Sequence, residues 1–253
     1  MSDAVVTRSS APSRTTEAPR RRWSPSRLAG AAVLGAWATL FWWLLLTGRD
    51  DFYLSTRTQW VVPVGATLLT LASIGRVATA RTRTPEPVRR GEAWIMGAVV
   101  VPVVLVMALP PATLGQFSAG KRSGFASAGV ATSAGDIASG ELTLIDVAAA
   151  QTSPEGERAL ASRAGEQVDF VGFVTRYEDT PADELFLTRY VVTCCVADAT
   201  IAQVRVVNAT PGAFEPNDWV LVRGAIYPIG REVIVNASEI VGVERPERPY
   251  LTP

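Results

Sequence analysis

The stretch LAGAAVLGAWATLFWWLLLT, residues 28–47, decides the class of fold, because its 20 residues carry no charge. A helix needs about 20 mostly apolar residues to cross roughly 30 Å of hydrocarbon, where every backbone amide must be bonded within the helix. Residues 58–75 and residues 93–117 form two further uncharged stretches. A buried helix of a soluble protein would show a polar face, and the first and third stretches show almost none. The sequence therefore predicts three transmembrane spans within residues 28–117.

The arginines that flank these stretches predict their orientation, since cytoplasmic flanks collect Lys and Arg. Residues 14–27 hold five arginines and residues 76–90 hold five more, whereas residues 48–57 hold two arginines offset by two aspartates. We therefore expect a multi-pass plasma-membrane protein with a disordered cytoplasmic tail over residues 1–27 and an extracytoplasmic C-terminal half. The core of each span lacks ionisable residues, which argues against a transport path through this chain alone. Small residues between Gly30 and Ala38 would let another helix approach closely.

The region after the third span changes in composition and in charge. Residues 115–140 are Gly, Ser or Ala at 17 of 26 positions, a composition that buries too little apolar surface to fold. We expect a flexible linker over residues 118–140 and a separate extracytoplasmic domain over residues 141–253. Residues 1–140 carry 15 Lys and Arg against 7 Asp and Glu, whereas residues 141–253 carry 9 against 17. The two halves therefore face different surroundings.

The pattern of the last domain predicts strands. Ser153 followed by Pro154 is typical of a helix N-terminus, and predicts one short helix to about Ser162. Alternating or β-branched runs then follow at residues 167–177, 184–193, 201–208, 218–227 and 232–243. Five strands in about 90 residues favour an OB-like five-stranded barrel, with a small sandwich as the alternative. The predicted fold class is thus a membrane α-helical half joined to an all-β domain. OB barrels often bind nucleic acid, but a net charge of −8 would repel phosphate, so we expect no nucleic-acid partner.

Two adjacent cysteines, Cys194 and Cys195, are the densest chemical signal in a chain that has no histidine. The lack of histidine excludes His-containing triads and His-based zinc sites. Together with Asp198, the two thiols could bind zinc or copper(I). They could also form a vicinal disulfide in an extracytoplasmic redox protein, or pack on a strand as small fillers with one thiol inward and one outward. We identify no catalytic residue and do not expect an enzyme.

Around the cysteines the sequence resembles the YcgQ-like family of uncharacterised bacterial membrane proteins, which are described as subunits of two-component permeases. The resemblance covers most of the chain after about Arg22. The matching positions are Gly48, residues 53–57, residues 168–174, Phe186, Arg189, the Cys194-Cys195-x-Ala197-Asp198-Ala199 motif, Trp219 and Gly224. It implies a non-enzymatic accessory subunit whose partner is a polytopic YraQ-like permease, with a suspected link to metal ions. A structural membrane anchor with an interaction domain remains an alternative.

Overall fold

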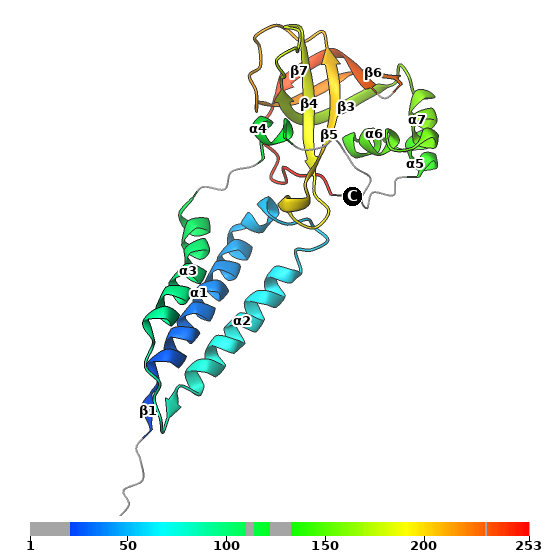
Figure 1. Cartoon of the computed structure of the whole chain (residues 1–253). Helices are drawn as coiled ribbons and strands as arrows, with labels where there is room; N and C mark the ends of the chain where they lie inside the picture. The colour runs from blue at the N-terminus through cyan, green and yellow to red at the C-terminus, as the bar shows by residue number, and fades with distance from the viewer. Residues whose placement is uncertain (1–20, 110–113, 122–132, 231, 253) are drawn as a thin grey trace, which may run out of the picture.

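A stem of three long helices carries a compact β-barrel at one end (Figure 1). The computed structural model describes residues 21–109, 114–121, 133–230 and 232–252. In these residues three helices are long and apolar enough to cross a membrane, α1 (Pro25–Thr47), α2 (Val61–Ala78) and α3 (Arg90–Ala108). They confirm the three expected spans. The third is shorter than residues 93–117, because Leu109 is already extended, as expected of a residue that precedes a proline.

The small residues of α1 face α2 of the same chain. Ala31 and Ala38 are buried, and Ser73 on α2 donates a 2.9 Å hydrogen bond to the carbonyl of Ala31. A Cβ atom at Gly65 of α2 would lie 2.7 Å from the ring of Phe41. The close helix approach that the sequence predicts is therefore used within the chain. By contrast, most of the apolar surface of α3 stays exposed.

The second half forms the closed five-stranded barrel that the sequence predicts. Its strands are β3 (Gln167–Thr175), β4 (Glu184–Val191), β5 (Thr200–Val207), β6 (Trp219–Ile229) and β7 (Glu232–Gly242). They follow the order β3-β4-β5-β7-β6 around the barrel, and all neighbours are antiparallel except β5 and β7. Alternate residues point inward and form one core, which includes Leu185, Leu187, Val204, Val206, Val220, Val222 and Val235. Closure leaves the sheet without a free edge.

Between residues 134 and 161 three short helices pack beside the barrel, where the sequence predicted one. They are α5 (Ala134–Ser139), α6 (Leu144–Ala150) and α7 (Pro154–Ala161). The predicted cap of α7 is confirmed, since the Ser153 hydroxyl accepts a 3.0 Å hydrogen bond from the amide of Gly156. The additional helix α6 begins with a capping box between Thr143 and Asp146. The capping-box residues can be read in the sequence, but the apolar run that follows them is too short to predict a helix.

The expected flexible linker differs from the structure at both of its ends, while residues 122–132 lie outside the described residues. Residues 114–121, here called the strap, include helix α4 (Gln116–Ala119) and lie against the outside of the barrel. The Tyr190 hydroxyl donates a 2.8 Å hydrogen bond to the carbonyl of Gly115, and Ala119 is buried. On the other side of the gap, Ile137 in α5 is buried in the barrel core cluster. A Gly, Ser and Ala-rich composition thus did not prevent these flanks from packing.

Candidate functional site

The two cysteines lie in the loop between β4 and β5, residues 192–199, here called the Cys loop. This loop contains the short 3₁₀ helix η2 (Val196–Asp198) and lies at the end of the barrel that faces the membrane helices (Figure 1). Cys194 is exposed and Cys195 is half-buried. The alternative in which the two cysteines pack on a strand, with one thiol inward and one outward, is therefore wrong, because β4 ends at Val191.

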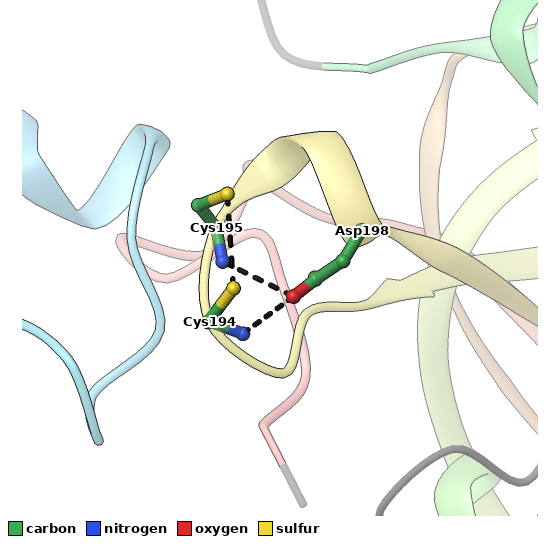
Figure 2. A group of neighbouring side chains, drawn as sticks. All are labelled: Cys194, Cys195 and Asp198. Carbon is green, nitrogen blue, oxygen red and sulfur yellow. Dashed lines mark hydrogen bonds between the residues drawn. The ribbon is translucent and has the colours of Figure 1, made fainter.

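Asp198 organises the backbone of the Cys loop (Figure 2). Its Oδ2 accepts hydrogen bonds from the amides of Cys194 (2.8 Å) and Cys195 (3.4 Å). Its Oδ1 accepts one from the amide of Thr193 at 3.1 Å. Desolvation by burial raises the pKa of Asp198, but the hydrogen bonds from the Cys194 thiol and from these amides outweigh it and lower the pKa below its ordinary value. Asp198 is therefore ionised at neutral pH, and Oδ1 still has a lone pair to offer.

The thiols lie side by side next to this carboxylate. The Sγ atoms of Cys194 and Cys195 are 3.8 Å apart, and one donor atom from each of Cys194, Cys195 and Asp198 lies within 4.8 Å of the others. Hydrogen bonding to Asp198, and then to Cys195, raises the pKa of the Cys194 thiol to about 11. Without a bound cation, Cys194 therefore keeps its proton at neutral pH and is a poor nucleophile.

This arrangement is closer to a metal site than to a disulfide. Two thiolates at about 2.3 Å from a tetrahedral zinc ion are about 3.8 Å apart, which is the separation that the two Sγ atoms already have. A disulfide needs a sulfur separation of about 2.05 Å, so the two sulfurs would have to approach each other considerably. The distance from the carboxylate oxygen to each sulfur, at most 4.8 Å in this structure, would be about 3.5 Å around a tetrahedral ion. Two sulfurs and one oxygen leave one position of a tetrahedral ion for water or another ligand.

Four of the other motif residues lie away from the thiols and have structural roles. Arg189 donates hydrogen bonds to the carbonyls of Arg248 (2.7 Å) and Pro249 (3.2 Å), and desolvation by burial lowers its pKa. Its guanidinium also lies 5.7 Å from the centre of the Trp219 ring. Phe186 packs against Tyr177 and Arg205 on the barrel surface. Gly224 lies at a bulge between β6 and β7. Ala197 is in η2, within the Cys loop, but has no donor atom to offer.

Sequence reasoning missed the residues against which the Cys loop packs. They belong to the α1–α2 loop, residues 48–60, which includes the 3₁₀ helix η1 (Arg49–Phe52). The carbonyl of Cys194 accepts hydrogen bonds from the amide of Ser55 at 3.1 Å and from the hydroxyl of Thr58 at 2.6 Å. Leu54 and Cys195 form an antiparallel bridge. Residues 53–57 are among the positions that resemble the YcgQ-like family, but no local sequence pattern predicts their contact with the cysteines.

The last described residues complete this contact region, which we call the junction. Arg248 forms an ion pair with Asp51 at 3.5 Å, and the hydroxyls of Thr56 and Thr252 are 3.3 Å apart. Leu251 forms a parallel bridge with Val191 at the end of β4, and its amide donates to the carbonyl of Tyr190 at 2.8 Å. The Cys loop, the α1–α2 loop and the C-terminal segment are therefore held together between the barrel and the membrane helices.

Comparison with known proteins relates one part of this structure to a family. A search of curated proteins finds no match to the chain. The region from residue 151 to residue 253 begins just before α7 and contains all five barrel strands, the Cys loop and the C-terminal segment of the junction. This region, residues 151–253 of a membrane-associated chain, matches the family described as the DUF1980 C-terminal domain.

Proposed function

We propose that this protein is a non-enzymatic accessory subunit of a membrane permease, and that it binds a thiophilic metal ion, zinc or copper(I), through Cys194, Cys195 and Asp198. The observation that carries the proposal is the 3.8 Å separation of the two Sγ atoms, beside a carboxylate that its hydrogen bonds keep ionised. Both thiols belong to a surface loop that contacts the α1–α2 loop, which connects two of the membrane helices. The ion is thereby held where it can meet a partner in the membrane.

The accessory role follows from what the spans contain. Their cores have no ionisable side chain, whereas ion and substrate paths through membranes are usually lined by such groups. The exposed face of α3 offers apolar side chains such as Val101, Val104 and Leu105, which suit lipid or a neighbouring helix. The resemblance to YcgQ-like proteins supports a polytopic YraQ-like permease as that neighbour. Transport by this chain alone in proteoliposomes would contradict the accessory role.

We expect the full chain in detergent, reduced and stripped of metal, to bind about one equivalent of zinc or copper(I). Cys194→Ser and Cys195→Ser should each weaken binding by more than about 100-fold, because each removes a ligand atom. Ala197→Ser is the matched control, since it places the same hydroxyl in the same loop without removing a ligand. Calorimetry and native mass spectrometry measure the affinity and the stoichiometry.

Two results would contradict the metal site. Equal zinc affinity of the wild type and the Cys194→Ser variant would show that the ion is bound elsewhere. A metal-free chain whose mass is lower by two hydrogen atoms, both before and after incubation with zinc, would favour the vicinal disulfide and the redox function.

The arginines at the other end of the stem support a cytoplasmic N-terminus and an extracytoplasmic barrel. Thr84, between α2 and α3, and Thr210, between β5 and β6, are both exposed. In a Cys194→Ser/Cys195→Ser background, Thr210→Cys should react with a membrane-impermeant maleimide in intact cells. Thr84→Cys should react only after the cells are lysed. The opposite pattern of labelling would reverse the orientation.

A further inference from the structure

We infer that a metal ion at Cys194, Cys195 and Asp198 controls how firmly the barrel is attached to the α1–α2 loop. This inference rests on the proposed metal site and adds its regulation: the bound ion holds the junction closed, and loss of the ion loosens it. Metal binding thereby affects the α1–α2 loop and, through it, the two helices that the loop connects.

The same residues serve both contacts. Cys194 offers its Sγ to the metal, while its carbonyl accepts hydrogen bonds from the Ser55 amide and the Thr58 hydroxyl. Cys195 offers the second Sγ, while its backbone pairs with Leu54. Next to it, the amide of Val196 donates to the carbonyl of Tyr53 at 3.0 Å. The thiols that would bind the metal and the backbone groups that contact the α1–α2 loop belong to the same residues. The conformation of this one peptide segment therefore determines both the geometry of the metal site and the contact with the loop.

Closure of the junction and metal binding therefore require the same loop conformation. In the closed junction the two Sγ atoms already have the spacing of a tetrahedral site. An ion that binds this conformation better than an open one shifts the population toward it. Reciprocally, the factor by which the bound ion strengthens docking equals the factor by which docking strengthens metal binding. That reciprocity lets the coupling be measured at either end.

The docked loop leads directly into the second span. Ser55 is fully buried, and its carbonyl accepts hydrogen bonds from the amides of Thr58 and Gln59. The carbonyl of Thr58 in turn accepts one from the amide of Val61, the first residue of α2. Gln59 also bonds the Asp51 carboxylate of η1. A change at Ser55 or Thr58 is thus transmitted by a continuous series of turns to the ends of α1 and α2.

Hydrogen exchange and zinc titration of the full chain in detergent test this inference. Zinc should slow exchange of the Ser55 and Val196 amides, which are both bonded across the junction, by at least about tenfold relative to the metal-free chain. Thr58→Val removes the hydroxyl that bonds the Cys194 carbonyl but removes no ligand. It should weaken zinc binding by about 2- to 10-fold, the equivalent of one net hydrogen bond.

The matched control is Thr67→Val, because Thr67 lies outside the junction and its hydroxyl donates a hydrogen bond within α2, to the carbonyl of Pro63. Its zinc affinity should stay within about twofold of the wild type. If wild-type zinc binding leaves exchange of Ser55 and Val196 unchanged, the coupling is overturned while the metal site stands. If wild type binds no zinc, the proposed metal site fails, and the coupling fails with it. The exchange measurement uses only the wild-type chain, so it tests the coupling even if Thr58→Val does not fold.

Discussion

Gly224→Ala is expected to destabilise the barrel by about 3 kcal/mol or more, the upper range for overpacking a core. A Cβ atom at this position would lie 2.8 Å from the carbonyl carbon of Asn236, still closer to its oxygen, and 2.9 Å from the Cα of Ala237. These atoms belong to the backbone of β7, which pairs with β6 along most of its length. The strands can separate only by breaking the ladder that closes the barrel, so no side chain can relieve the clash.

The control for this substitution lies in the same pair of strands. A Cβ atom at Gly242 would approach only the ring of Phe214, at 3.9 Å, which is an ordinary contact. Gly242→Ala should therefore change stability by less than about 1 kcal/mol. The stability of both variants can be measured by urea denaturation of the full chain in detergent, with pulse proteolysis reporting the fraction of unfolded barrel. Equal midpoints for the two variants would show that the bulge at Gly224 tolerates a side chain.

Tyr190→Ala is expected to cost about 3–5 kcal/mol of barrel stability, as for other buried aromatic side chains. Tyr190 is almost fully buried outside the barrel core, where it stacks on Phe173 at 5.6 Å and meets the edge of Tyr250 at 6.3 Å. Its hydroxyl also holds the carbonyl of Gly115 in the strap. The substitution should therefore release the strap as well as weaken the barrel, and trypsin should cleave faster after the exposed Lys121.

Two tyrosine variants separate these effects. Tyr190→Phe keeps the ring and should cost only about 1 kcal/mol, the net value of the hydrogen bond to Gly115. Tyr177→Ala removes a partly exposed ring from the barrel surface and should cost less than about 1 kcal/mol. If cleavage after Lys121 is no faster in Tyr190→Ala than in Tyr177→Ala, the strap does not depend on Tyr190.

The parts of the fold that the sequence predicted are those set by neighbouring residues. Alternation along β3 to β7 and the cap at Ser153 are local signals, and the spans follow from composition. The packing of the strap and of α5 was missed because Ala119 and Ile137 are isolated apolar residues among small ones, and only contact with distant elements buries them. The clustering of Cys194, Cys195 and Asp198 was foreseeable, because residues so close in sequence meet in a tight loop. Their contact with Ser55 was not, because it joins two segments that share no local pattern.

The junction joins residues that are very far apart in the chain, and this has a consequence for the order of folding. The hydroxyl of Thr58 reaches across 136 residues to Cys194, and that of Thr56 reaches across 196 residues to Thr252. Contacts across such long separations carry the largest loop-closure entropy and form late. The α1–α2 hairpin and the barrel can each nucleate earlier from contacts between nearer segments. Attachment of the barrel to the stem is therefore the final folding step, and it takes place between two parts that are already built.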